Sequence, residues 1–419
     1  MKPLLLPLFA VVIVSLGVMP QVHAQGEFTP RQFDWPQWQG PNRTAISQEK
    51  GLLQSWPEGG PKLLWKATGL GKGYSTPTVA AGRIFIMGSI DKSEYVIALR
   101  EKDGKLLWKT AIGTARSSGP RCSPTVDGNR VYALGFSGDL ACLDVASGDI
   151  HWQKQLRKDF EGRVGGWGYC ESPLIDGDWI LCTPGNKNHA MVALNKNNGE
   201  VIWSCQNPGE DRAEYSSIVK GKLAGVDQYV QFVQRGVIGV RASDGKLLWQ
   251  YKSPANRTAN CSTPIILRND TVFAASAYGT GGGLAKIVKK GDKFEAEEVY
   301  FCRDIPNHHG GMVLVDGLIY GQGSGGMVCL DAESNEILWR SRQAGRGSIA
   351  YADGRLYYRS EGGEGTVFLI EPSREKFILH GQFDQPDRSR ARAWAHPVIA
   401  NGKLFIADQD SLFCYNVKR

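Results

Sequence analysis

The chain has 419 residues, of which 42% are hydrophobic and 22% charged, and its formal net charge is +7 at pH 7. The excess of basic residues is mild and scattered, so it predicts no dedicated nucleic-acid surface and we expect no nucleic-acid partner. Length alone suggests about two or three domains of ~150 residues each. Internal repeats, described below, favour one domain instead.

The N-terminus has the order of features that is typical of a secretory signal. Lys2 precedes an apolar run from Leu4 to Val18, and Val22-His23-Ala24 supplies a small-residue cleavage site. The run is short compared with the roughly 20 residues of a spanning helix, so a signal peptide over residues 1–24 is favoured over a membrane anchor. The sequence thus predicts an exported protein, periplasmic or secreted, whose mature chain has no transmembrane segment.

Residues 25–62 form an aromatic and proline-rich lead-in without the alternation of a strand. It contains the run Asp34-Trp35-Pro36-Gln37-Trp38. We expect the lead-in to pack across the domain that follows, with Trp35 and Trp38 as anchors, because aromatic side chains bury much apolar area. The alternative is that these two indoles stack on a bound sugar or quinone.

From residue 63 onward the chain is built from copies of one unit. The clearest copy begins at Ser123-Pro124, turns at Asp127-Gly128-Asn129 into an alternating strand, and ends, after the turn Ser147-Gly148, in a strand that carries Trp152. These turn residues and the period of two predict a four-stranded antiparallel meander.

Two series of recurring residues show how many copies of the unit the chain contains. Tryptophans mark fourth strands at intervals of roughly 45 residues, the last interval being double: Trp65, Trp108, Trp152, Trp203, Trp249 and Trp339. Val299-Tyr300-Phe301 falls where the missing tryptophan is expected. First strands start near Ser75, Ser123, Ser172, Ser216, Ser262, Gly310, Gly347 and His396.

The two ends of the repeat complement each other. The copy that starts near His396 has three strands, whereas the strand of Trp65 has no first three. A period in the forties with four strands per unit predicts an all-β, eight-bladed β-propeller over residues 63–419. Its last blade is completed by the N-terminal outer strand, which closes the ring and removes exposed sheet edges.

The recurring pattern of Ser-Pro, Gly-Arg-Ile-Phe, Leu-Asp and Asp-Gly-Lys-Leu-Leu-Trp resembles the pyrroloquinoline quinone (PQQ)-like propeller repeat. The resemblance covers roughly residues 34–419. It implies a propeller of the quinoprotein alcohol dehydrogenase-like superfamily, which also includes the non-catalytic propeller lipoprotein of the bacterial outer-membrane assembly machine. This chain is similar to that propeller in length and blade count, but no lipid-attachment cysteine follows its apolar run.

In such a meander, the links between blades deliver residues to the start of each inner strand, beside the central channel. Loops on a rigid scaffold commonly carry binding residues. The links hold polar and aromatic side chains that we expect to form a ligand-binding funnel: Arg121, Trp167, Tyr169, Glu171, Tyr215, Asn260, His308, His309, Arg346, Arg392, Trp394 and His396.

The nine cysteines allow disulfides in an exported chain. Cys142, Cys329 and Cys414 share one slot of the third strand, so we expect them to be free and buried. A bond between Cys122 and Cys170, which precede neighbouring inner strands, is an alternative for those two.

Metal ligands are also present, although we predict no metal site. His308, His309 and His396 with Glu171 are the candidates for a metal ion, and Asp91, Asp139, Asp408 or Asp410 for calcium. We favour none of these sets, because adjacent histidines rarely reach one ion together and the spacing of a calcium loop is absent.

Two functions from different classes follow. The favoured one is an exported, monomeric binding or scaffold module, not an enzyme, whose funnel holds a protein, peptide or glycan and needs no cofactor. The alternative, implied by the resemblance, is a dehydrogenase that oxidises an alcohol or sugar with PQQ and calcium. Glu171 would then be the base, while Arg392 would meet a carboxylate of the quinone and Trp394 or Trp167 would stack on it. The adjacent cysteine pair of those enzymes is missing.

Overall fold

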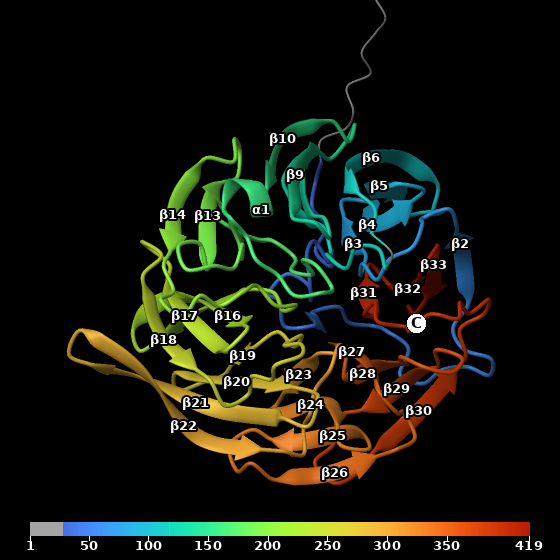
Figure 1. Ribbon diagram of the computed structural model, residues 1–419. Coiled ribbons are helices and arrows are strands. Elements are labelled where there is room, and N and C mark those ends of the chain that lie inside the picture. The colour runs from blue at the N-terminus through green and yellow to red at the C-terminus, as the bar shows by residue number, and fades with distance from the viewer. Residues whose placement is uncertain (1–27, 117) are drawn as a thin grey trace, which may run out of the picture.

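The computed structural model describes residues 28–116 and 118–419, and it is a closed ring of blades (Figure 1). Each of its eight sheets contains four strands in antiparallel order, and one of them gains a short fifth strand from the lead-in. The predicted eight-bladed propeller is therefore confirmed. The predicted signal peptide lies outside the described residues.

The first half of the ring contains blades one to four. In order from the channel outward, their strands are β3 (Thr78–Ala80), β4 (Arg83–Ile90), β5 (Ser93–Arg100) and β6 (Leu106–Thr114); β7 (Thr125–Asp127), β8 (Arg130–Leu134), β9 (Asp139–Asp144) and β10 (Ile150–Gln155); β11 (Leu174–Asp176), β12 (Trp179–Cys182), β13 (Met191–Asn195) and β14 (Val201–Cys205); and β15 (Val219–Leu223), β16 (Val226–Val233), β17 (Gly236–Arg241) and β18 (Leu247–Tyr251). A single turn of helix, α1 (Leu156–Asp159), follows β10.

The second half contains blades five to eight. Their strands are β19 (Ile265–Ile266), β20 (Thr271–Ser276), β21 (Gly281–Lys290) and β22 (Lys293–Cys302); β23 (Met312–Val315), β24 (Leu318–Gly323), β25 (Gly326–Asp331) and β26 (Ile337–Ser341); β27 (Gly347–Ala352), β28 (Arg355–Ser360), β29 (Val367–Glu371) and β30 (Ile378–Phe383); and β31 (Val398–Ala400), β32 (Lys403–Asp408) and β33 (Ser411–Asn416).

The ring is closed by the strand of Trp65, as the sequence predicts. Strand β2 (Leu63–Ala67) pairs antiparallel with β33, so it is the outer strand of blade eight. In Figure 1 the blue β2 accordingly lies beside the red β33. Strand β2 thereby covers the edge of β33 that the three C-terminal strands alone would leave unpaired.

Most of the repeated tryptophans join their blade to the next. The Trp108 indole donates a hydrogen bond to the carbonyl of Val145 at 3.1 Å and covers Gly148 in the following blade. A Cβ on Gly148 would lie 2.6 Å from that ring, and its φ of +79° also favours glycine. The Gly-Lys, Gly-Glu and Gly-Asp turns are thus docking points for the tryptophan of the preceding blade. The same contact pairs Trp65 with Gly104, Trp152 with Gly199 and Trp203 with Gly245.

Blade five lacks this tryptophan, and a tyrosine takes its place. The Tyr300 hydroxyl donates to the carbonyl of Ala332 in blade six at 2.8 Å. Its ring also packs against Phe273, with 6.5 Å between the ring centroids. The seam between blades five and six therefore keeps a hydrogen bond like those that the indoles of Trp65, Trp108, Trp152 and Trp339 make to the next blade.

The lead-in crosses the channel rather than the outside of the ring. Trp35 is 2% exposed and bridges Val79 of the first inner strand. Arg43 is buried and donates from its guanidinium to the carbonyls of Ser172 and Ile218. Strand β1 (Ile46–Ser47) then pairs parallel with β27 on the opposite side of the ring. The lead-in thus plugs the channel, which agrees with its predicted packing role.

All nine cysteines are free. Cys142, Cys329 and Cys414 are fully buried in third strands, as predicted. The alternative of a bond between Cys122 and Cys170 is wrong, because both thiols are free and buried. Over the described ranges, no helix is long and apolar enough to cross a membrane.

Candidate functional site

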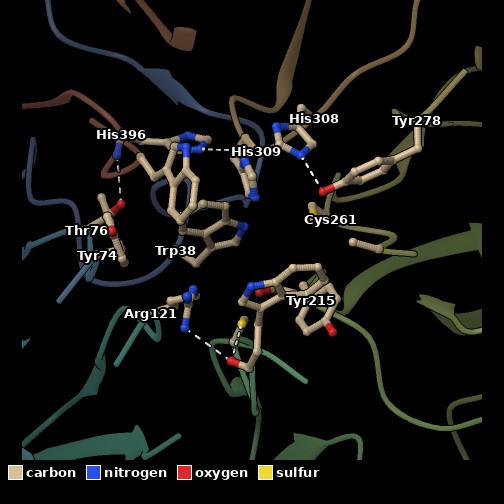
Figure 2. A pocket seen from close by; sticks show the side chains of 15 residues that line it. Trp38, Tyr74, Thr76, Arg121, Tyr215, Cys261, Tyr278, His308, His309 and His396 are labelled. Carbon is tan, nitrogen blue, oxygen red and sulfur yellow. Dashed lines mark hydrogen bonds between the residues drawn. The ribbon is translucent and has the colours of Figure 1, made fainter. Parts of the chain in front are cut away.

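The links between blades converge on a pocket at one end of the channel (Figure 2). Its volume is about 150 Å³, which is close to that of a cavity that holds one benzene ring. Every blade except the seventh contributes. The lining residues are Trp38, Tyr74, Thr76, Arg121, Trp167, Cys170, Tyr215, Ser217, Ala259, Cys261, Tyr278, His308, His309, Trp394 and His396.

The floor of the pocket is Trp38 of the lead-in. Its indole donates to the Thr263 hydroxyl at 3.0 Å, and its ring centroid lies 4.6 Å from that of His396. The His396 ring is itself fixed, because its Nε2 lies 3.0 Å from the carbonyl oxygen of His309. Figure 2 shows these three side chains together on one side of the cavity. The floor is therefore held in place before any ligand arrives.

Aromatic rings make up most of the walls. Trp394 stacks on His309, with 4.2 Å between centroids and 29° between planes, and packs against Tyr74 at 4.5 Å. Across the cavity, Trp167 meets Tyr215 edge to face at 5.6 Å. Trp167 is 42% exposed, so it lies at the rim. Such walls favour a flat or ring-shaped group over a chain of polar atoms.

Arg121 is the one cation among the lining residues. It lies over the Tyr74 ring at 5.3 Å and donates from Nη1 to the carbonyl of Trp167 at 3.1 Å. An arginine carries five N–H donors, so these contacts do not exhaust the guanidinium. No aspartate or glutamate lines the pocket. The pocket is thus apolar with a single positive charge.

The three lining histidines are neutral at neutral pH. Burial, reinforced by the charge of Arg346, lowers the pKa of His308 to about 4. Burial and the neighbouring His308 lower the pKa of His309 to about 2, and burial lowers that of His396 to about 4. The Nδ1 atoms of all three histidines and Nε1 of Trp394 are buried without a hydrogen-bond partner in the described structure. They are available to a bound group or a water molecule.

The pocket collects many of the residues that the sequence singled out: Arg121, Trp167, Tyr215, His308, His309, Trp394 and His396. Arg346 lies just outside it, in an adjoining hollow that it shares with His308. Arg392 is exposed and does not line the cavity.

Three other predicted residues point into the protein. The Tyr169 hydroxyl donates to the carbonyl of Pro184 at 2.9 Å. Glu171 is 2% exposed and accepts a hydrogen bond from the Thr183 amide at 2.7 Å. Asn260 is fully buried and donates to the carbonyl of Val233 at 3.1 Å. These side chains hold the links in place and do not line the cavity.

Three aromatic lining residues were not among the predicted site residues. Tyr74 precedes Ser75 as Tyr215 precedes Ser216, so the repeat itself carried a signal for it. Tyr278 stands in the glycine-rich loop between β20 and β21, which is not one of the links between blades on which the prediction rested. Trp38 lies in the lead-in, where stacking on a bound group was only the alternative to packing.

PQQ and calcium, which the repeat implies, do not fit these residues. PQQ is a tricyclic quinone with several carboxylates, whereas the pocket has the volume of about one ring and a single cation. Calcium requires six to eight oxygen ligands, commonly carboxylates, and no carboxylate side chain is among the lining residues. Glu171, the base of the dehydrogenase hypothesis, is buried away from the cavity.

The fold and this site define a closed eight-bladed propeller of PQQ-like repeats with an aromatic pocket at one end of its plugged channel. A family model described as outer membrane protein assembly factor BamB matches residues 92–324 and 303–369. The chain belongs to this family.

Individual relatives are distant. BamB of Salmonella typhimurium is 28% identical over 140 residues, which is 32% of this chain and 32% of that protein. The match therefore spans about a third of that relative's length. Tetrathionate hydrolase of Acidithiobacillus ferrooxidans is 23% identical over 336 residues, covering 75% of this chain and 59% of that protein.

Solved structures support the fold alone. BamB from Moraxella catarrhalis matches with a TM-score of 0.55 at 13% identity, covering 80% of this chain and 94% of that chain. Quinohemoprotein alcohol dehydrogenase from Comamonas testosteroni matches with a TM-score of 0.63 at 12% identity, covering 92% and 80%. A BamB protein and an alcohol dehydrogenase therefore share this fold, so the fold alone does not indicate the function of this chain.

Proposed function

We propose that the protein is an exported binding module, not an enzyme, that holds a partner protein by an aromatic side chain inserted into the channel pocket. The observation that carries the proposal is the pocket itself: aromatic walls, a volume of about one ring, and Arg121 as its single cation. Export rests on the signal-like N-terminus and on the family, whose description places it in outer-membrane protein assembly.

The lining favours a peptide group over a glycan or a cofactor. No aspartate, glutamate, asparagine or glutamine lines the cavity, so it offers few partners for the hydroxyl groups of a sugar. Aromatic walls instead favour another aromatic ring through stacked and edge-to-face contacts. Arg121 then suits a carboxylate near that ring, because charge-assisted hydrogen bonds are the stronger ones. The predicted peptide therefore carries an acidic group beside an aromatic side chain.

The test is a fluorescence titration, because Trp38, Trp167 and Trp394 all line the pocket. The purified chain is titrated with the blocked dipeptide acetyl-Asp-Phe-amide, with chitobiose, and with PQQ plus calcium. We expect saturable quenching by the dipeptide. Arg121→Met should weaken this binding about tenfold or more, which corresponds to the loss of one charge-assisted hydrogen bond.

Arg116→Met is the matched control. Arg116 lies on the same link as Arg121 but bonds to the Ser137 hydroxyl, outside the pocket. It should leave the affinity unchanged. Saturation by chitobiose instead of the dipeptide would overturn the peptide assignment. Saturable uptake of PQQ with calcium, followed by dye-linked alcohol oxidation, would overturn the binding module in favour of the dehydrogenase.

A further inference from the structure

Two adjacent histidines and a glutamate from the neighbouring blade meet at the rim of the pocket. His308 and His309 lie on the link from β22 to β23, and Glu361 directly follows β28. Their potential ligand atoms, ring nitrogens and a carboxylate oxygen, all lie within 4.8 Å of one another. The three residues therefore converge although they come from different blades.

The surroundings fix these side chains but leave ligand atoms unused. Nε2 of His308 lies 3.0 Å from the Tyr278 hydroxyl, whereas Nδ1 of His308 and Nδ1 of His309 are buried and have no partner among the described residues. The Glu361 amide donates to the carbonyl of Arg346 at 2.8 Å, and its carbonyl accepts from Ala393 at 2.9 Å. A histidine whose second nitrogen is hydrogen-bonded is typical of metal ligands, because that bond orients the ring.

The donor set of two imidazoles and one carboxylate selects the kind of ion. Two histidines and one glutamate bind zinc in known sites, and imidazole suits zinc and related transition metals. Calcium prefers six to eight oxygen atoms, so a single carboxylate does not suit it. Ligand atoms about 2.0–2.1 Å from a tetrahedral ion are roughly 3.4 Å apart. Small side-chain rotations would therefore bring the three groups from their present separation to bonding distance.

Arg346 shares a hollow with His308, and its positive charge opposes a cation there. An ion at this position therefore has to gain more from its imidazole and carboxylate ligands than it loses to this repulsion.

We propose that His308, His309 and Glu361 bind one divalent transition-metal ion of the zinc type at the rim of the channel pocket. His308 and His309 also line the cavity, so an ion held by them would lie at its edge. This inference does not depend on the peptide ligand proposed above.

The experiment measures metal directly. The purified protein is treated with a chelator, dialysed against Zn²⁺, and its bound zinc is determined by mass spectrometry; Co²⁺ then serves as a spectroscopic probe. We expect one zinc per chain and a cobalt visible spectrum of nitrogen and oxygen ligation. His308→Ala and the isosteric Glu361→Gln should each weaken the zinc affinity at least about tenfold.

Two control variants separate this site from other metal-binding groups. His151→Ala removes an exposed histidine on the outer strand of blade two, and Cys261→Ser removes one of the two thiols that line the pocket. Both should retain the metal. A thiolate-to-cobalt charge-transfer band that disappears in Cys261→Ser would overturn the proposal, as would zinc binding that is unchanged in Glu361→Gln and His308→Ala. Absence of stoichiometric zinc from the folded wild-type protein would overturn it too.

Discussion

Aromatic side chains lie both at the seams between blades and at the end of the channel, but their polar atoms differ in hydrogen bonding. At the seam of blades one and two, the Trp108 indole covers a glycine and its N–H bonds to the carbonyl of Val145. In the channel, the Trp394 N–H and the Nδ1 atom of His309 have no partner in the described structure. Most seam indoles have a partner of this kind, Trp203 being an exception, whereas several ring nitrogens gather without a partner at the channel end.

The largest effect is expected where the lead-in anchors the channel. Arg43→Ala removes a buried guanidinium and leaves the carbonyls of Ser172 and Ile218 without their donor. Loss of such a group should reduce the free energy of unfolding by about 3–5 kcal/mol. Urea denaturation checks this. Arg241→Ala, which breaks an exposed pair with Asp244, should cost less than about 1 kcal/mol. Similar losses in both variants would show that the lead-in does not stabilise the ring.

The next largest effect tests the seams. Gly148→Ala places a Cβ 2.6 Å from the Trp108 ring at a φ of +79°, which should cost about 2–4 kcal/mol from overpacking and backbone strain. Gly177→Ala is the matched control, because its φ is +58° and nothing lies within 4 Å of the added atom. Thermal unfolding of the two variants separates crowding from strain. Equal unfolding temperatures for the two variants would mean that the Trp108 ring moves aside without a loss of stability.

A smaller effect depends on pH. Burial raises the pKa of Glu171 to about 8 from a usual value of 4.5, so the folded state holds a proton that the unfolded state releases. The stability contributed by this group is fully present below about pH 4.5 and is lost as the pH rises through about 8. Glu171→Gln should match the wild type at pH 4 and exceed its stability by ~1–2 kcal/mol at pH 8. A stability difference independent of pH, measured by urea denaturation at both values, would contradict this.

The smallest effect is expected at the seam of blades five and six, where Tyr300 stands in place of a tryptophan. Tyr300→Phe keeps the ring but removes the hydroxyl that donates to Ala332 at 2.8 Å. The free energy of unfolding should fall by ~0.5–1.5 kcal/mol, the net contribution of one hydrogen bond. Calorimetry can detect this shift. A loss as large as that of Gly148→Ala would mean that the hydroxyl does more than replace an indole N–H.

The sequence predicted the ring because the repeat is local. Each tryptophan and each turn glycine can be recognised within its own copy, and their contacts are made between equivalent copies. The residues of the pocket do not repeat from blade to blade. The repeat therefore predicted which links reach the pocket, but not which side chains of each link point into it. Glu171 and Trp167 stand on one link, yet only Trp167 lines the cavity.

Contacts between residues on different sides of the channel could not be predicted from local sequence patterns. Trp38 enters from the lead-in, outside the repeat. Likewise, the carboxylate that accompanies His308 and His309 is Glu361 of the adjacent blade, not Glu171. Such pairings depend on how the ring closes, and spacing along the chain does not encode them.

Closure by the lead-in also determines when the protein can finish folding. Asn401 donates a hydrogen bond to Asp34, 367 residues earlier, and β2 pairs with β33 at the far end of the repeat. During synthesis at ~5–20 residues per second, the lead-in has no complete channel to enter until the last blade has been made. Folding therefore ends in a late step dominated by non-local contacts, and such steps are slow. Until it occurs, β33 exposes a strand edge that can pair with another chain.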